Sequence, residues 1–141
     1  MKLITNVVII FLLTIFMLNC KNKTYYKDGI YSGKSKSIYT DENFWGSVKL
    51  VVKNGEITEV NFCIIDSTNH EIFDPNYENH YIGNDLYIQQ CKDNWQGIIR
   101  YPEKLIQTQD IDNVDIISGA TWSYNMLKHS TIEALRDAKT Q

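Results

Sequence analysis

The sequence predicts an α+β domain made of an antiparallel β-sheet covered by helices. Three patterns in the 141 residues point to this fold class. Residues 46–53 and 56–65 are rich in β-branched residues and flank Asn54-Gly55, a strong hairpin signal. Apolar residues then recur at helical spacing between positions 88 and 98, and again through residues 122–139. A chain of this length forms one small domain rather than two.

Composition and charge limit the function classes. Hydrophobic residues make up 43% of the chain and aromatic residues 12%, which is enough to build a core and argues against global disorder. The formal net charge is −3. Because no basic surface is implied, we expect no binding of nucleic acid.

The first residues of the chain differ from the rest. Lys2 precedes a run from Val7 to Leu18 that contains only apolar residues and Thr14. This layout is typical of a signal peptide, and the run is shorter than the ~20 apolar residues that span a membrane comfortably.

The residues that end this run, Met17-Leu18-Asn19-Cys20, resemble a bacterial lipoprotein signal. The resemblance implies that residues 1–20 are a signal peptide and that Cys20 becomes the first mature residue and carries acyl chains. Residues 21–27 then form a short basic tether beside anionic headgroups, and residues 28–141 form the functional domain. The alternative is an uncleaved anchor. Both interpretations place the domain in the cell envelope, outside the cytoplasm and tied to a membrane.

Residues 29–39 are rich in Tyr, Ile and Ser and predict a first strand, which precedes the hairpin. In the hairpin we expect a three-residue loop, because it pairs Leu50 with Thr58 and Val48 with Val60 and thereby keeps one apolar face. That face comprises Val48, Leu50, Val52, Val60, Phe62 and Ile64. The loop requires Gly55 at positive φ, as in a type I turn followed by a bulge.

Residues 66–83 are polar and predict a surface loop. A helical stripe follows it at Ile88, Cys91, Trp95 and Ile98. Pro102 suits the first turn of another short helix that ends at Gln107. The helix at 122–139 presents one apolar face, formed by Tyr124, Leu127, Thr131, Ala134, Leu135 and Ala138.

Two cysteines remain after Cys20. Cys63 and Cys91 either form one disulfide, as an oxidising compartment permits, or are two buried thiols. Neither belongs to a Cys-x-x-Cys pair or a histidine cluster, so no metal site is predicted. His70, His80 and His129 are isolated, and we expect them at the surface.

The segment from Asp115 to Thr121, Asp-Ile-Ile-Ser-Gly-Ala-Thr, is a turn of small residues that opens directly onto the last helix. Helix N-termini bind anions, because their first N–H groups are unpaired and the helix dipole is positive there. Gly119 allows the backbone to approach a bulky anion, and Thr121 adds a hydroxyl. The simpler alternative is an ordinary N-cap.

This segment resembles the flavinylation motif D-x-x-[ST]-G-A-T of the FMN-binding domain family. That family includes flavinylated components of the sodium-pumping NADH:quinone oxidoreductase and of the Rnf complex, as well as small stand-alone lipoproteins. The residues that follow the motif at 122–127, the opening at 28–33 and the hairpin at 46–60 are also similar to the family's patterns. The similarity covers residues 28–65 and 102–139, whereas residues 66–101 do not resemble the family's short connection.

The resemblance implies that FMN is joined to Thr121 through a phosphoester. A separate flavin transferase would install it outside the cytoplasm, using FAD and Mg²⁺. Ser118, Gly119 and Ala120 would contact the phosphate, and Ser123 would add a hydroxyl. Asp115 either caps the turn or serves the transferase.

The ring of FMN requires a flat apolar surface. Trp122 is adjacent to the attachment point and is the first candidate; the others are Trp45, Tyr31, Tyr39 and Tyr124.

The resulting hypothesis is a membrane-tethered flavoprotein that carries electrons between membrane redox partners. The sequence contains no Ser-His-Asp set, paired-carboxylate motif or metal cluster, so a redox carrier is favoured over a self-contained enzyme. Two alternatives stay open. One is an FMN domain that binds its flavin without a covalent bond. The other is an envelope lipoprotein that binds a ligand or partner and has no flavin.

Overall fold

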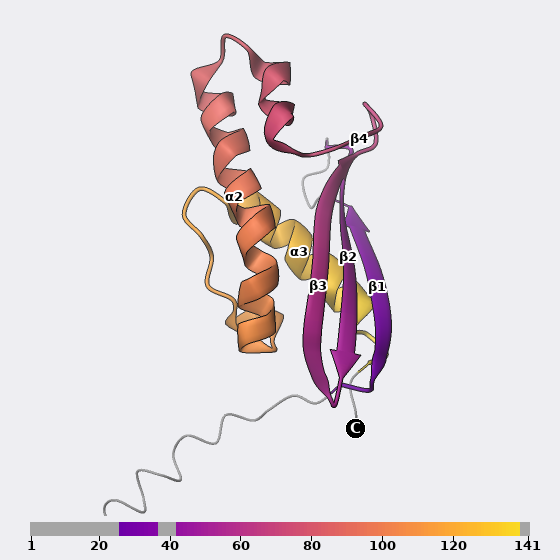
Figure 1. The fold of residues 1–141 in the computed structure, drawn as a ribbon. Helices are drawn as coiled ribbons and strands as arrows, with labels where there is room; N and C mark the ends of the chain where they lie inside the picture. Colours follow the sequence, from indigo (N-terminus) through magenta and orange to yellow (C-terminus); the bar gives the residue numbers. More distant parts are fainter. Residues whose placement is uncertain (1–25, 37–41, 139–141) are drawn as a thin grey trace, which may run out of the picture.

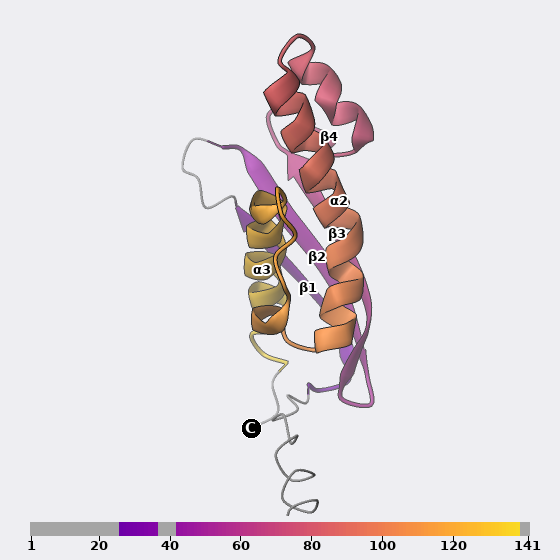
Figure 2. The same ribbon diagram turned by 90° about the vertical axis from the view of Figure 1, so that its left-hand side faces the viewer.

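The computed structural model describes residues 26–36 and 42–138. Its described strands form one antiparallel sheet in the order β1-β2-β3-β4, and two long helices pack against one face of that sheet (Figures 1 and 2). The predicted α+β class is therefore confirmed. In chain order the elements are β1 (Gly29–Lys36), β2 (Phe44–Lys53), β3 (Glu56–Asp66), β4 (Glu71–Ile72), the 3₁₀ helix η1 (Pro75–Tyr81), α2 (Asp85–Thr108), the 3₁₀ turn η2 (Ile111–Asn113) and α3 (Thr121–Ala134).

The hairpin between β2 and β3 is confirmed, but its predicted register is wrong. Lys53 pairs with Glu56 across a two-residue turn, in which Asn54 and Gly55 both have positive φ, 54° and 77°. This pattern belongs to a type I′ turn, which Asn-Gly favours. A register shift follows between Val51 and Val52.

That bulge explains the error. It adds one residue to β3, so Leu50 pairs with Val60 and Val48 with Phe62. The predicted apolar face is preserved, and Ile57 joins it as a buried residue.

Tyr26 and Lys27, which were predicted to belong to the tether, contact the folded domain. The Tyr26 side chain is 5% exposed, and its N–H donates to the Gly55 carbonyl at 3.2 Å. Lys27 N donates to the Ala138 carbonyl at 2.8 Å. The predicted signal peptide, Cys20 and residues 21–25 of the predicted tether lie outside the described residues.

Residues 66–83 are not a simple surface loop, contrary to the prediction. They contain β4 and η1, and they bury Phe73 and Tyr77. These two rings pack with Ile64, Cys91 and Met126 in a second apolar cluster beside the main core. The prediction failed because most residues of the segment are polar, and Phe73 and Tyr77 do not stand out among them.

The predicted break at Pro102 is also wrong, because α2 continues through it as one helix of 24 residues. A proline inside a helix removes one backbone hydrogen bond and disfavours the helix. Here Tyr101 and Leu105 are fully buried on the core side of this turn. Their packing keeps the helix continuous. The predicted stripe is confirmed, with Cys91 and Ile98 buried.

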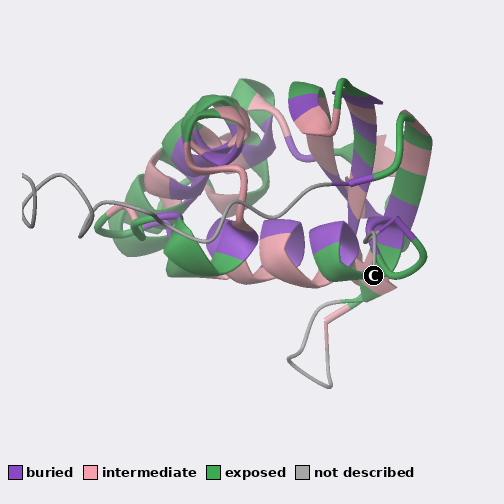
Figure 3. Cartoon of the chain, turned by 90° about the horizontal axis from the view of Figure 1, so that it is seen from below, coloured by how far each residue is buried: buried purple, intermediate pink, exposed green. Residues whose placement is uncertain are grey.

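Helix α3 carries most of the predicted apolar face, but it ends at Ala134 and not at residue 139. Leu135 and Ala138 are buried in the turn that follows it. The helix packs very closely on the sheet. A Cβ at Gly33 of β1 would lie 2.1 Å from the Ser130 carbonyl oxygen, and one at Gly46 of β2 would lie 2.6 Å from that of Met126. Larger residues at these points would push the helix away. Buried positions accordingly lie between the helices and the sheet, while exposed positions alternate with them along the strands (Figure 3). Among the described helices, none is long and apolar enough to cross a bilayer.

Candidate functional site

A cavity of about 430 Å³ opens between α2, η1 and the first turn of α3. Its volume lies within the range of small-molecule and cofactor sites. Aromatic rings dominate the lining, together with a few polar groups. The lining residues are Glu42, Phe44, Phe73, Tyr77, Tyr81, Tyr87, Gln90, Cys91, Asn94, Gly119, Thr121 and Trp122.

Thr121 lies at the rim of this cavity as the first residue of α3, and it is exposed. The N-cap position belongs to Ala120, and no side chain caps this helix. The N-cap interpretation of Thr121 is therefore wrong. Its hydroxyl makes no hydrogen bond to any described residue, so it is available for chemistry.

The first turn of α3 offers backbone donors. Ser123 N donates to Asn94 Oδ1 at 3.1 Å. The N–H groups of Thr121 and Trp122 meet no acceptor among the described residues, as expected at a helix start. Together with the helix dipole, these groups favour an anion at this end of the cavity.

The charges around Thr121 are otherwise unusual for an anion site. None of the described residues that line the cavity is Lys, Arg or His, and the one charged lining residue is Glu42. The carboxylate of Asp93 also packs against Gly119, whose φ is 79°; a Cβ on Gly119 would lie 2.6 Å from Asp93 Oδ2. An anion at this point would meet backbone donors but no cationic side chain among the described lining residues.

The turn before Thr121 is fixed to α2 by one buried tyrosine. The Tyr101 hydroxyl donates to the Ala120 carbonyl and accepts from Ile117 N, both at 3.0 Å. Burial raises the pKa of Tyr101, so this hydroxyl stays protonated. Gly97 lets α2 approach the turn, since its Cβ would lie 2.8 Å from the Ala120 Cβ. The position of Thr121 is thus determined by contacts with α2.

Trp122 lies between two other aromatic rings of the cavity. Its Nε1 donates to Glu42 Oε2 at 2.8 Å. Its ring centroid lies 5.1 Å from that of Phe44, edge to face, and 5.3 Å from that of Phe73. These contacts fix the indole next to Thr121.

The segment that the sequence left unassigned supplies the opposite wall. Phe73 stacks on Tyr77 with centroids 4.7 Å apart, and Tyr81 stacks on Tyr87 at 5.0 Å with an interplanar angle of 19°. Sequence reasoning missed all four residues. The signal that could have found them is their spacing, because an aromatic residue recurs every four to six positions.

Residues 43–136, two thirds of the chain, match the FMN-binding domain. The chain belongs to the FMN-binding domain family.

Membership of this family supports a flavin-binding role with FMN as the cofactor. The fold is similar to the crystal structure of the CPE2226 protein from Clostridium perfringens, with a TM-score of 0.60 and 20% identity over 80% of this chain and 88% of that chain. A solution NMR structure from Clostridium thermocellum has a TM-score of 0.45 and 19% identity, over 79% of this chain and 91% of that chain. No curated protein matches significantly.

The residues of the predicted motif fall into three groups. Gly119, Thr121 and Trp122 line the cavity. Ala120 and Ser123 are fully buried, and the Ser123 hydroxyl donates to the Ala120 carbonyl at 3.0 Å, away from the cavity.

Ser118 and Asp115 are not buried and do not line the cavity. In the described part of the chain Asp115 makes no hydrogen bond, so it does not cap the turn.

The other ring candidates lie elsewhere. The hydroxyl of Tyr31 donates to the Lys27 carbonyl, and that of Tyr124 donates to the Ile111 carbonyl within the core. Trp45 lies on β2 outside the cavity. Tyr39 lies outside the described residues.

The two thiols are free, so the disulfide alternative does not hold in this structure. Cys63 lies between Phe62 and Ile64 in β3. Because successive side chains of a strand point to opposite faces, Cys63 lies on the sheet face opposite the helices. Cys91 lines the cavity, and burial raises its pKa. No group of His, Cys, Asp or Glu within the described ranges could hold a metal ion.

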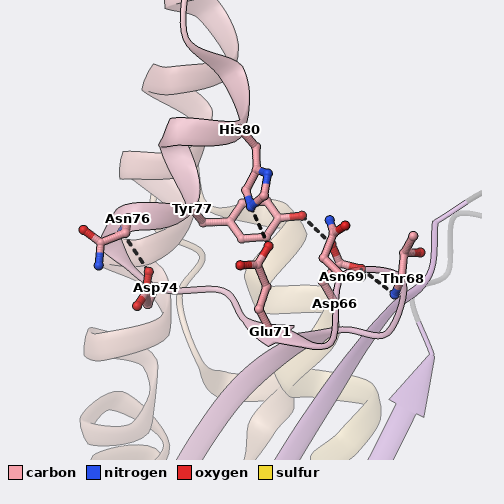
Figure 4. A network of polar contacts seen from close by, with 8 residues as sticks. All are labelled: Asp66, Thr68, Asn69, Glu71, Asp74, Asn76, Tyr77 and His80. Atoms are coloured by element: carbon pink, nitrogen blue, oxygen red, sulfur yellow. Dashed lines mark hydrogen bonds and ion pairs between the residues drawn. The ribbon is translucent and has the colours of Figure 1, made fainter.

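A buried carboxylate holds η1 against the end of the sheet (Figure 4). Asp66 accepts from the Tyr77 hydroxyl at 2.7 Å, from Thr68 N at 2.8 Å, and from both the backbone and the side chain of Asn69. Burial alone would raise the pKa of Asp66, but these bonds outweigh it and lower the pKa. Burial and the Asp66 contact raise the pKa of Tyr77.

Beside this network His80 pairs with Glu71 (Figure 4). The pair is partly exposed. His80 is therefore a surface residue, as predicted.

Proposed function

We propose that this protein is an extracytoplasmic, membrane-tethered flavoprotein that carries electrons through FMN joined to Thr121. The observation that carries the proposal is the exposed Thr121 hydroxyl, which has no capping role and lies at the rim of a cavity lined with aromatic rings. The 430 Å³ cavity and the backbone donors of α3 suit a flat ring system that ends in a phosphate.

Attachment is a phosphoryl-type transfer that needs a separate enzyme. The Thr121 hydroxyl oxygen attacks the phosphorus of the FMN half of FAD, loses its proton, and displaces AMP. The product is a phosphodiester between Thr121 and the ribityl chain of the flavin. The transferase and Mg²⁺ supply the activation. Asp115 is exposed near this turn, and we assign it to recognition by the transferase.

The charges of the site favour a covalent bond over reversible binding. A diffusible phosphate ligand needs strong, charge-assisted contacts, for which Arg and Lys are the usual donors. The cavity lining has none among the described residues, and Asp93 and Glu42 oppose an anion. A covalent link makes such cations unnecessary, and it retains the cofactor in a compartment from which free FMN would be lost.

The bound flavin would supply one- and two-electron redox chemistry. The chain contributes position and surroundings. Trp122, Phe44 and Phe73 form an apolar surface beside Thr121. Among the lining residues we identify no pair of groups that would move a proton on a small substrate. This supports a carrier that exchanges electrons with other proteins.

The membrane tether rests on the sequence pattern of residues 1–20. An acylated Cys20 and a chain that enters the domain at Tyr26 leave a short linker. We therefore propose that the domain stays close to the membrane surface and meets its redox partners there.

The test requires export in cells that contain the flavin transferase. Purified wild-type protein is denatured and precipitated, and we expect the yellow colour to remain with the chain. Thr121→Ala removes the colour. Thr58→Ala, which removes an exposed threonine hydroxyl on β3 outside both the motif and the cavity, is the matched control and keeps it.

Two outcomes contradict the proposal. Colour that leaves the denatured wild-type chain supports noncovalent FMN. Natively exported protein that never absorbs in the flavin band, although a known acceptor protein is flavinylated in the same cells, supports a lipoprotein without flavin.

A further inference from the structure

The cavity extends away from Thr121 along one face of α2. Tyr87, Gln90, Cys91 and Asn94 all line it, and their spacing places them on one side of the helix. From Tyr87 to Asn94 the helix rises about 10 Å. Asn94 marks the end near Thr121, because its Oδ1 accepts from Ser123 N. Tyr87 marks the opposite end.

The chemistry of FMN decides which end holds the ring. A ribityl chain of several carbons separates the phosphate from the isoalloxazine, so a flavin attached at Thr121 carries its ring away from the attachment point. Trp122 is the neighbour of Thr121 and is already held by Phe44, Phe73 and Glu42. The stacked pair Tyr81–Tyr87 lies further along the cavity, and Tyr87 remains 49% exposed.

The polar groups along α2 are amides. Both side-chain atoms of Asn94 are engaged within the chain, with Ser123 N and with the Gln90 carbonyl. The Gln90 side chain makes no hydrogen bond to any described residue. A glutamine amide has an N–H donor and a C=O acceptor side by side, which complements the imide edge of a flavin.

We infer that the segment from Phe73 to Asn94 is the ring subsite, in which the isoalloxazine stacks on Tyr87 and its imide edge bonds to Gln90. This inference rests on the proposed attachment at Thr121. The Asp66 network holds Tyr77 in place (Figure 4). Tyr77 in turn packs on Phe73 and Tyr81, which supports this wall. Residues 66–101, which do not resemble the family's pattern, thus supply most of the proposed ring subsite.

The test uses the full chain, exported and flavinylated in cells, with the attached flavin confirmed by mass. A tyrosine or tryptophan stacked on a flavin quenches its fluorescence. Tyr87→Leu should therefore raise emission per flavin several-fold, whereas Tyr87→Trp should keep it low. Leu86→Ala is the matched control, since Leu86 is 79% exposed beside Tyr87 and does not line the cavity.

A second readout examines Gln90. Gln90→Leu removes a donor to a flavin carbonyl, so the midpoint potential of the attached flavin should fall. Gln96→Leu, exposed on the same helix and outside the cavity, should leave the potential unchanged.

The outcomes separate the inference from the proposed function. Attached flavin with the same emission in wild type and Tyr87→Leu, or with the same potential in wild type and Gln90→Leu, overturns the subsite while Thr121 attachment stands. A wild-type chain without flavin in competent cells overturns both.

Discussion

Replacing Gly97 with alanine tests how the position of Thr121 is set. Gly97 lies where α2 crosses the first turn of α3. An ideal Cβ there would approach Ser123 Oγ to 2.4 Å, Tyr101 Cε2 to 2.7 Å and the Ala120 Cβ to 2.8 Å. These neighbours cannot easily move, because the Tyr101 hydroxyl is bonded at both sides and Ser123 is fully buried.

Two effects of opposite sign determine how far Gly97→Ala changes the free energy of unfolding. In an exposed helix, Gly→Ala stabilises by about 1 kcal/mol. Overpacking a rigid core costs about 1–3 kcal/mol, and three contacts below 3 Å place this site at the upper end. We therefore expect Gly97→Ala to lower the free energy of unfolding by about 2 kcal/mol, which lowers Tm by roughly 8 °C in a domain of this size.

The assay is urea unfolding followed by far-UV circular dichroism, with Gln96→Ala as the control, because Gln96 is exposed on the same helix turn. The yield of flavin attached to Thr121 should also fall, because the turn before it must shift. A Gly97→Ala midpoint equal to or above that of the wild type would refute the packing argument, since helix propensity alone predicts that result.

Three further predictions follow from individual contacts. Gly55→Val places a β-branched residue at φ 77° and should cost about 1–2 kcal/mol in urea unfolding; an unchanged midpoint would count against the type I′ turn. Asp66→Asn should destabilise at pH 7. The pKa of Asp66 is lower in the folded chain than in the unfolded chain, where it is about 3.9. Its carboxylate therefore adds fully to the free energy of unfolding above the unfolded pKa, and this contribution is lost as the pH falls through the folded pKa. The stability difference between wild type and Asp66→Asn must therefore vanish in acid. Gln90→Lys adds a cation to a cavity whose described lining has none, and should raise the flavin midpoint potential by tens of millivolts in a spectroelectrochemical titration; a lower potential would contradict this.

Local patterns predicted most of the fold correctly. The hairpin, its apolar face and both amphipathic helices follow from spacing alone. The register of the hairpin was not predicted correctly. The two-residue Asn-Gly turn and the bulge near Val51 together keep the same residues on the apolar face as a three-residue loop would. A pattern of faces cannot distinguish that pair from a simple three-residue loop.

The helix break at Pro102 failed for a different reason. Burial of Tyr101 and Leu105 overrides the local preference of proline. Tertiary packing of this kind is not visible in a single segment.

The candidate site was predictable at Thr121 and only partly beyond it. A motif states which residues are adjacent in sequence, whereas the helix rotates Ser123 into the core and leaves Thr121 outside. The aromatic wall from Phe73 to Tyr87 escaped prediction because three of its four rings lie in the polar segment 66–83, whose composition outweighed the regular spacing of the aromatic residues.

The central claim is a covalent bond at one threonine. Peptide mapping by tandem mass spectrometry, on protein exported by cells that contain the transferase, measures it directly. We predict that the peptide containing Thr121 gains the mass of FMN less one water, and that fragmentation locates the gain on that residue. An unmodified Thr121 peptide, beside a fully flavinylated acceptor protein from the same cells, would contradict the account.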